Sequence, residues 1–403
     1  ALEGKQVSGQ IEVAAQPDYS FPVLLSPVEL QLKAGIISYI DPGLSAQTKA
    51  RIKDVGEKTI NYLKTVLPKA KFDMPIIAAA KVKSPGGSGY DGDAGNVLRL
   101  GLLNWPEQLD ARHDKMLTTF VSHEFSHRFQ LRDAVDIYPQ ARLIHEGGAE
   151  FLRWYTALSV GWISHQEAAA ELDESLGKCF LGTEHAAWGA LSGQHIGSRQ
   201  LEYRCGLAVY VYGLATRQNT QSAMHNFGEF YDRLKLGNKL DFNDAIECAG
   251  QLNCHAKWLA QLLGASRPMQ EVWREMLNTS SLAKEIKATQ AQTDLMIKKA
   301  FSLLMADDCG ASSYFETPDG LIVDDIKSCR QLRAEMKVAG VEGHKLFGNM
   351  QALPALMLAC KTRNEVKINI EHAADLTLAC KTKYQAVDSF YSVDIEEVLK
   401  RLQ

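Results

Sequence analysis

Several features are scarce or absent in this 403-residue sequence. No apolar stretch approaches the ~20 residues that a membrane-spanning helix needs, so we expect no membrane span. Lysine and arginine form no basic run and the net charge is −4, so nothing indicates nucleic acid as a partner. No two cysteines form a C-x-x-C pair, which argues against a metal site built from thiolates.

The eight cysteines are even in number, which indicates disulfides in an oxidising compartment, with buried free thiols as the alternative. The simplest pairing joins cysteines that are neighbours in the sequence. The chain begins with Ala1 rather than methionine, as it would after removal of a signal peptide, although a trimmed chain would begin in the same way. We therefore expect a periplasmic or secreted protein.

Apolar and charged residues make up 46% and 23% of the chain, values that are ordinary for a soluble globular protein. Alternating or short apolar runs predict strands within the first forty residues or so, at 74–82 and at 96–103. Ser45 is expected to cap a helix that ends near Leu67, where Pro68 follows.

Residues 84–95 are rich in glycine, serine and aspartate and are predicted to form a loop. From Asp114 to about Leu277 the apolar periodicity is helical almost throughout. A small sheet followed by a helical lobe is an α+β arrangement, which is the fold class that we expect.

The chain changes character near residue 300. Beyond it, strand-like runs and one helix-like run follow at 321–326, 336–338, 350–360 (the helix) and 365–370. We therefore expect three parts, which are an N-terminal β segment over 1–43, a main domain over 44–299 and a smaller β-rich domain over 300–403.

The most informative segment contains the pattern H-E-x-x-H at His123, Glu124 and His127. Residues four apart share one face of a helix, so both histidines can reach one metal ion. Glu124 lies one step round the helix and can contact water without binding the metal. Roughly one chain in a hundred of this length would hold the pattern by chance.

A second segment, Leu-Ile-His-Glu-Gly-Gly-Ala-Glu-Phe, makes chance a poor explanation. Eighteen residues separate His127 from Glu146, a spacing at which a second, antiparallel helix can return a carboxylate to the metal. Glu150 lies one turn further and faces the same way. The sequence therefore predicts one Zn²⁺ ion held by His123, His127 and Glu146.

These two segments resemble the H-E-x-x-H and N-E-G-x-A-E motifs of the gluzincin zinc metallopeptidases, above all the aminopeptidase N and leukotriene A hydrolase branch. The resemblance implies a thermolysin-like catalytic domain over 44–299 and a peptide or protein substrate. It also implies a water activated by zinc, with Glu124 as the catalytic base. Glu150 would orient a zinc-binding histidine, as the matching residue does in thermolysin.

A third segment, Tyr-Arg-Cys-Gly from Tyr203, resembles that branch's Tyr-Glu-Lys-Gly, whose tyrosine stabilises the oxyanion. A core tyrosine with a bonded hydroxyl is the alternative for Tyr203. The substrate backbone is expected along the open edge of the strand at 96–103. The predicted substrate-binding residues on that strand are Asn96, Leu98, Leu100 and Gly101.

The sequence also departs from that branch. Its exopeptidases carry a Gly-x-Met-Glu-Asn segment whose glutamate holds the substrate's amine, and residues 89–101 contain no such motif. Asp91 or Asp93 could hold the substrate's amine instead. Cleavage inside peptides and aminopeptidase activity therefore both stay open. A zinc hydrolase of another substrate class and a non-catalytic peptide-binding protein on the same fold are further alternatives.

The last hundred residues carry a further resemblance. Residues 329–343, with the helix-like and strand-like runs that follow, resemble part of a PDZ domain, which glycyl aminopeptidases of another gluzincin branch carry after the catalytic domain. The resemblance implies a PDZ-like C-terminal domain; an unrelated small α+β domain is the alternative.

Overall fold

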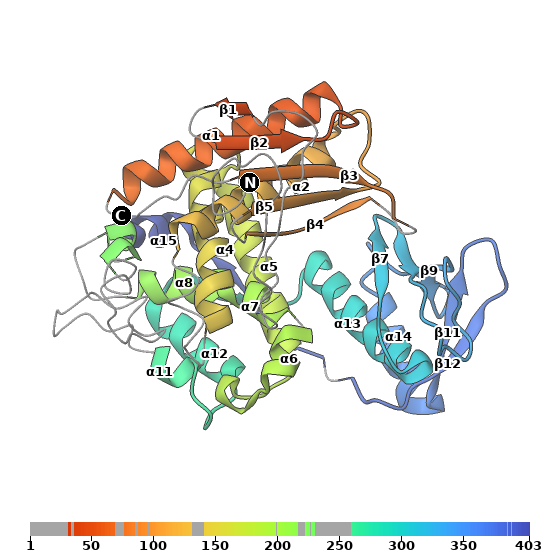
Figure 1. Ribbon diagram of the computed structural model, residues 1–403. Coiled ribbons are helices and arrows are strands. Elements are labelled where there is room, and N and C mark those ends of the chain that lie inside the picture. Colours follow the sequence, from red (N-terminus) through yellow and green to blue (C-terminus); the bar gives the residue numbers. More distant parts are fainter. Residues whose placement is uncertain are drawn as a thin grey trace, which may run out of the picture. The chain divides into compact units, whose positions relative to one another are not determined.

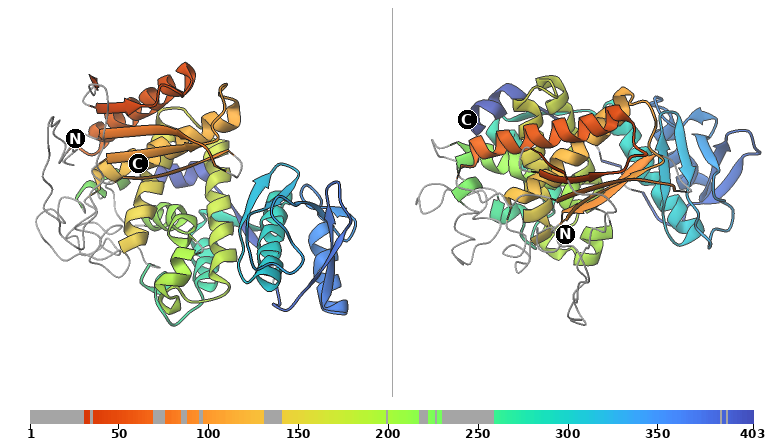
Figure 2. Two further views of the ribbon diagram at one scale, coloured as in Figure 1. Left: turned by 45° about the vertical axis from the view of Figure 1, so that its right-hand side comes forward. Right: turned by 45° about the horizontal axis from the view of Figure 1, so that its top comes forward.

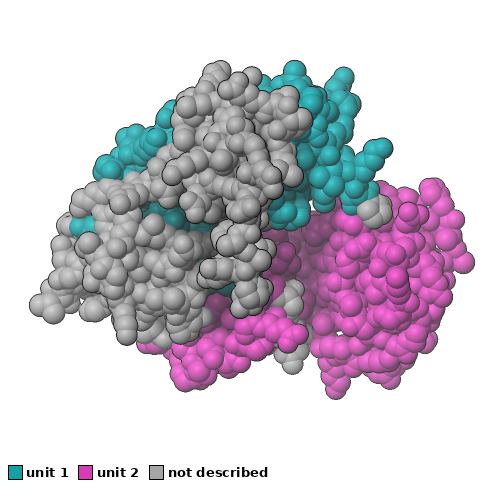
Figure 3. All heavy atoms as spheres, viewed as in Figure 1, with its two compact units in different colours: residues 1–168, 206–260, 395–403 teal, residues 169–205, 261–394 magenta. Residues whose placement is uncertain are grey.

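The structure is a computed structural model. It describes residues 31–33, 36–68, 76–84, 88–94, 97–130, 141–198, 200–216, 222–225, 227–229, 259–384, 386–387 and 389–403. The chain divides into two compact units, which Figure 3 shows in different colours. The first unit comprises residues 1–168, 206–260 and 395–403, and the second comprises residues 169–205 and 261–394.

The first unit contains a five-stranded sheet with the strand order β1-β2-β3-β5-β4 (Figure 1). The strands are β1 (Gln31–Lys33), β2 (Ile36–Ile40), β3 (Ile76–Val82), β4 (Gly89–Ala94) and β5 (Val97–Leu103). β2, β3 and β5 run parallel to one another, whereas β1 and β4 are antiparallel to their neighbours. Among the described strands, β4 is therefore an antiparallel edge strand, and β5 is paired on both sides. Figure 2 shows the sheet from two further directions.

Two helices share one apolar core with this sheet. α1 (Ala46–Val66) begins where the Ser45 side chain accepts a hydrogen bond of 3.1 Å from the Thr48 amide, and α2 (Ala111–Ser126) begins at Asp110 in the same way. The core side chains come from both helices and from β3 and β5: Ile52, Val55, Ile60, Ile77, Ala79, Leu98, Leu100, Leu102, Leu117, Phe120, Val121 and Phe125. Burial of these side chains fixes the rotation of α2 about its axis.

Further helices of the first unit follow α2 and pack on one another. η1 (His127–Phe129) continues α2, and α4 (Ala141–Ser159) packs against α2 on one side and α8 (Gly206–Ala215) on the other. α15 (Ile395–Leu402) packs against α8. Tyr210 of α8 donates its hydroxyl hydrogen to the Ile144 carbonyl of α4 at 3.0 Å.

The second unit contains a six-stranded sheet, with the order β12-β11-β9-β8-β7 and with β10 paired to β9, and a β13-β6 pair. Its strands are β6 (Ala283–Ile286), β7 (Tyr314–Thr317), β8 (Gly320–Val323), β9 (Lys337–Val341), β10 (His344–Lys345), β11 (Glu365–Ile370), β12 (Leu376–Ala379) and β13 (Phe390–Val393). Its helices are η2 (Trp188–Ala190), α6 (Gly193–Ser198), α7 (Leu201–Arg204), α12 (Met269–Ser280), α13 (Gln290–Cys309) and α14 (Ala352–Arg363); α5 (His165–Thr183) and α11 (Leu259–Leu262) span its boundaries.

Three disulfides lie in the second unit, and each joins cysteines that are neighbours in the sequence. They are Cys179–Cys205, Cys309–Cys329 and Cys360–Cys380. Cys248 and Cys254 lie outside the described residues. Disulfides fit a protein of an oxidising compartment such as the periplasm or the extracellular space. Within the described part of the chain, no helix is long and apolar enough to cross a membrane.

The α+β class expected from the sequence is confirmed, as are the helix after Ser45 and the strands that became β3 and β5. The loop predicted at 84–95 is wrong, because residues 89–94 form β4. Pairing of the β4 backbone with β5 outweighs the low strand propensity of glycine and aspartate. Strands were predicted within the first forty residues or so, where β1 and β2 lie, and residues 1–30 lie outside the described residues. The three-part domain division stays a prediction.

A close helix contact in the first unit yields a test. A methyl group on Gly206 of α8 would lie 2.5 Å from the Gly147 Cα atom of α4, and backbone cannot rotate away as a side chain can. We expect Gly206→Ala to lower the free energy of unfolding by about 1–3 kcal/mol. Denaturant titration measures this against Gly193→Ala, where nothing lies within 4 Å. Equal stability of the two variants would contradict the packing.

Candidate metal centre

The predicted histidines lie at the end of α2 and the start of η1, beside side chains of the apolar core. Phe120, Val121 and Phe125 are buried in the apolar core, and His123 and Glu124 follow on the same helix, while His127 begins η1. His123, Glu124 and His127 are each only 7% exposed. Imidazoles and a carboxylate at this depth need polar or ionic partners.

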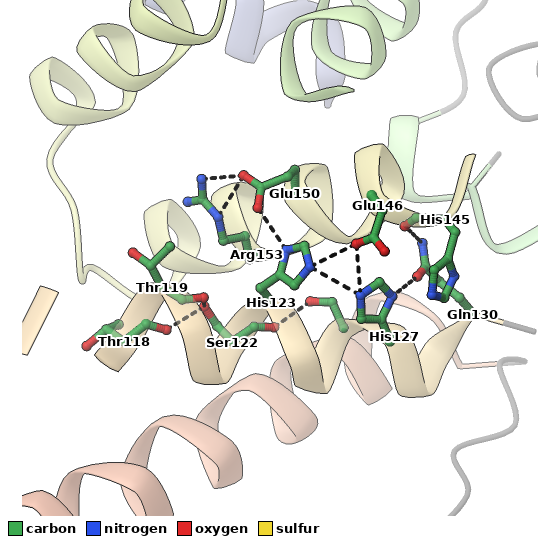
Figure 4. A network of polar contacts seen from close by, with 11 residues as sticks. Thr118, Thr119, Ser122, His123, His127, Gln130, His145, Glu146, Glu150 and Arg153 are labelled. Atoms are coloured by element: carbon green, nitrogen blue, oxygen red, sulfur yellow. Dashed lines mark hydrogen bonds and ion pairs between the residues drawn. The ribbon is translucent and has the colours of Figure 1, made fainter. Parts of the chain in front are cut away.

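The α4 helix supplies the partners. His127 Nε2 lies 3.4 Å from Glu146 Oε2, and His123 Nδ1 lies 2.8 Å from Glu150 Oε1 (Figure 4). The earlier histidine contacts the later glutamate, and the later histidine contacts the earlier glutamate. The segments that carry them are therefore antiparallel, as the spacing in the sequence predicted.

Three donor atoms converge between the helices. His123 Nε2 lies 3.2 Å from His127 Nε2 and 3.3 Å from Glu146 Oε2, so with the 3.4 Å contact of His127 the three atoms form a nearly equilateral triangle (Figure 4). Ligand atoms on a tetrahedral Zn²⁺ ion, with bonds of ~2.0–2.1 Å, lie about 3.3 Å apart. The triangle therefore has the size that zinc requires, and the three residues form a candidate metal site compatible with zinc.

A second layer of contacts orients the histidines. His123 Nδ1 faces Glu150, and His127 Nδ1 lies 2.8 Å from Gln130 Oε1. Gln130 Nε2 donates to the His145 carbonyl at 3.0 Å, which fixes the amide so that its oxygen faces His127. With hydrogen on each Nδ1, both Nε2 lone pairs point to the metal position.

Further groups support this layer. The Arg153 guanidinium donates to Glu150 Oε2 from Nε at 3.0 Å and from Nη2 at 2.6 Å, so it holds the carboxylate that faces His123. The His145 ring stacks on the His127 ring with centroids 4.0 Å apart. Sequence reasoning missed both Gln130 and Arg153, although each lies three residues after a site residue and so shares its side of the chain.

The electrostatics of the site favour positive charge. Burial alone would lower the pKa of His123, but its contacts with Glu146 and Glu150 raise the pKa to about 10. Burial opposes ionisation of Glu146, yet its contacts with His123 and His127 hold its pKa well below the usual range. Arg153 and His123 likewise outweigh burial and lower the pKa of Glu150 to about 2. A cation at the three donor atoms would replace the proton that these carboxylates attract.

Two other sequence predictions concern residues beyond the triangle. Glu150 lies where the resemblance places it, beside His123. Tyr203 lies on α7 in the second unit and is half-buried, and its role in the site stays a prediction.

The expectation of an open edge on the strand at 96–103 is wrong. β5 pairs with β3 along one side and with β4 along the other, so its backbone groups are already bonded. Leu98 and Leu100 are buried in the core, and Asn96 lies outside the described residues. A part for Leu98, Leu100 or Gly101 in substrate binding stays a prediction. Among the described strands, the edge of the sheet next to α2 is β4.

Comparisons with known proteins show a structural similarity but no match in sequence. No protein-family model and no curated protein matches this chain. Its fold is similar to that in a crystal structure described as an aminopeptidase N family protein from Idiomarina loihiensis, with a TM-score of 0.51 and 12% sequence identity. The alignment covers 93% of this chain and 70% of that chain. At this identity the likeness shows the fold alone.

The second layer yields a prediction for metal affinity. Gln130→Leu removes the oxygen that faces His127 Nδ1 and leaves a side chain of similar size, so we expect zinc affinity to fall by about 10- to 100-fold. Competition with a chromophoric chelator measures the affinity. Gln351→Leu, an exposed site in the second unit, is the matched control. Equal zinc affinity of the two variants would show that Gln130 does not orient the ligand.

Proposed function

We propose that this chain is a zinc-dependent peptidase of thermolysin-like type that hydrolyses peptide bonds, with Glu124 as the general base. The observation that carries the proposal is the triangle of donor atoms from His123, His127 and Glu146, with edges of 3.2–3.4 Å. The similarity of the fold to that of an aminopeptidase N family protein supports it.

When bound, zinc would supply a Lewis acid that polarises a carbonyl group and lowers the pKa of water. Glu124 follows His123 directly on α2 but is not one of the three donors. Its carboxylate accepts the proton of the water that attacks the scissile carbonyl and returns it to the leaving amine. Glu150 and Gln130 keep hydrogen on the Nδ1 atoms of the two histidines, so the ligands stay in one tautomer.

Tyr203 completes the proposed machinery by donating its hydroxyl hydrogen to the oxyanion. Support for this role is the resemblance of its segment to the Tyr-Glu-Lys-Gly motif. Loss of one such donor typically lowers the rate by about a hundredfold or more.

The edge strand β4 is the proposed guide for the substrate backbone. An extended peptide can add to such an edge through main-chain hydrogen bonds. Tyr90 of β4 is 41% exposed and stacks on Phe120 of α2 with ring centroids 4.3 Å apart. Burial and the nearby charges of Glu150 and Glu124 raise the pKa of Tyr90, so this tyrosine lies on the site's side of the sheet.

Two alternatives stay beside the main proposal. A zinc aminopeptidase is favoured by the name of the structural neighbour, which is an aminopeptidase N family protein. A non-catalytic peptide-binding protein is disfavoured by Glu124, because metal binding does not require that residue. A PDZ-like identity for residues 300–403 and secretion or periplasmic location belong to the proposal as well.

The decisive variant is Glu124→Gln. We expect it to keep one zinc ion, because all three donors remain, and to lose peptide hydrolysis by at least about a hundredfold, because the base is gone. Metal analysis and cleavage of a mixed peptide library, read by mass spectrometry, measure the two outcomes. Glu271→Gln, an exposed glutamate of α12, is the control. Undiminished hydrolysis by Glu124→Gln would remove Glu124 from the mechanism.

The mode of cleavage has its own test. An exopeptidase must pair the substrate's ammonium group with a fixed carboxylate, since an unpaired buried charge is costly. Residues 89–94 supply only Asp91 and Asp93, in place of the glutamate of exopeptidases. We expect N-terminal acetylation of peptides to leave hydrolysis largely intact. Loss of cleavage on acetylation, with removal of single residues from free peptides, would instead identify an aminopeptidase.

A further inference from the structure

A cavity of about 640 Å³ lies within the second unit, away from every residue of the metal centre in the sequence. Its walls are α13, α14 and the segment 380–384. The apolar lining consists of Ala300, Leu303 and Leu304 from α13 and Leu356, Met357 and Leu358 from α14. Small-molecule sites commonly have volumes of about 300–1,000 Å³ and a mainly apolar lining.

Positive charge gathers at this cavity. Lys361, Lys381 and Lys383 line it, and the described residues that line it include no aspartate or glutamate. The Asp307 carboxylate contacts the same segment, where it accepts hydrogen bonds of 2.8 Å from the amides of Lys381 and Thr382. The charge at the cavity therefore suits an anion.

One residue of the cavity wall carries a polar group without a partner among the described residues. The Tyr384 hydroxyl is buried and has no hydrogen-bond partner among the described residues, and burial raises the pKa of Tyr384 above its usual value. A buried hydroxyl without a partner is costly, so a ligand oxygen that accepts its hydrogen would be stabilised. Tyr384 is also one of the residues that this cavity shares with a second cavity.

Tyr384 also lines a smaller cavity of about 330 Å³. The two cavities share Leu303, Thr382, Lys383 and Tyr384. Phe180, Leu181 and Val387 add apolar surface in the smaller one, where Lys299 forms an ion pair with Glu184. The adjoining spaces suit an elongated apolar molecule better than a compact one.

The walls are held in place before any ligand binds. The Cys360–Cys380 disulfide ties α14 to the segment 380–384, and the Cys380 amide donates to the Asn364 carbonyl at 2.9 Å. Asp307 of α13 binds the same segment from the other side. Leu358, which also lines the cavity, is 61% exposed and so is reachable from solvent.

We propose that the second unit binds an amphipathic carboxylate, a molecule with a long unbranched apolar chain and one carboxylate group. The ligand's apolar chain lies on the leucines of α13 and α14, and its carboxylate faces the three lysines. The Tyr384 hydroxyl donates to an oxygen of that carboxylate. The proposal stands on the second unit alone and does not depend on the proposed peptidase activity.

Isothermal titration of the full chain with octanoate and dodecanoate, below their micelle concentrations, tests this site. We expect saturable binding of one dodecanoate per chain and weaker binding of octanoate, since less apolar surface is buried. Dodecanol, which lacks the charge, and dodecyltrimethylammonium, which reverses it, should bind at least about tenfold more weakly.

Variants locate the site. Tyr384→Phe should weaken dodecanoate binding by about 2- to 10-fold, the effect of one lost hydrogen bond. The pair Lys361→Gln and Lys383→Gln should weaken it by at least about tenfold, whereas Lys345→Gln, an exposed lysine of the same unit, should not. Thermal melts followed by circular dichroism ensure that each variant is folded.

The proposal is overturned if dodecanoate does not bind, if dodecanol binds as tightly, or if Tyr384→Phe and the double lysine variant keep full affinity. Tyr384→Phe removes a single oxygen that has no partner among the described residues, so we expect this variant to fold. It therefore tests the proposal even if the double lysine variant does not fold. Binding of a peptide with an apolar carboxyl-terminal residue, without binding of dodecanoate, would also overturn it and assign the cavity to polypeptide ends.

Discussion

Three electron-rich atoms meet between α2 and α4, in a place almost closed to water. His123 Nε2, His127 Nε2 and Glu146 Oε2 lie 3.2–3.4 Å apart, and each would repel the others unless a positive charge lay among them. The arrangement of both helices follows from this constraint. α2 fixes the histidines through its apolar face, and α4 brings the carboxylate from the opposite direction.

The approach of α4 depends on small residues as much as on charge. A side chain at Gly147 would meet the backbone of Gly206, and one at Gly148 would lie 2.4 Å from Gln130 Nε2. The two glycines of the His-Glu-Gly-Gly segment therefore make room for α8 on one side and for the amide that orients His127 on the other. Metal ligation and helix packing are thus coupled in one short stretch of chain.

Much of this site could be predicted from the sequence, because it is local. His123 and His127 share a helical turn, and Glu146 and Glu150 share another, so periodicity alone orients each pair. The pairing of strands depends on residues that are distant in the sequence, and here the prediction from the sequence was wrong. Residues 89–94 have the composition of a loop, yet they form the edge strand β4 because β5 offers an unpaired backbone edge. Gln130 was missed because nothing in its sequence context shows which group its amide contacts.

The proposed chemistry requires a metal ion at this triangle, and X-ray absorption at the zinc edge of the purified full chain detects such an ion. We expect one zinc ion per chain, bound only by nitrogen and oxygen at ~2.0–2.1 Å, with the outer-shell scattering of two imidazole rings. A chain that takes up no zinc when the metal is supplied, or zinc whose spectrum shows sulfur neighbours at ~2.3 Å, would contradict the account.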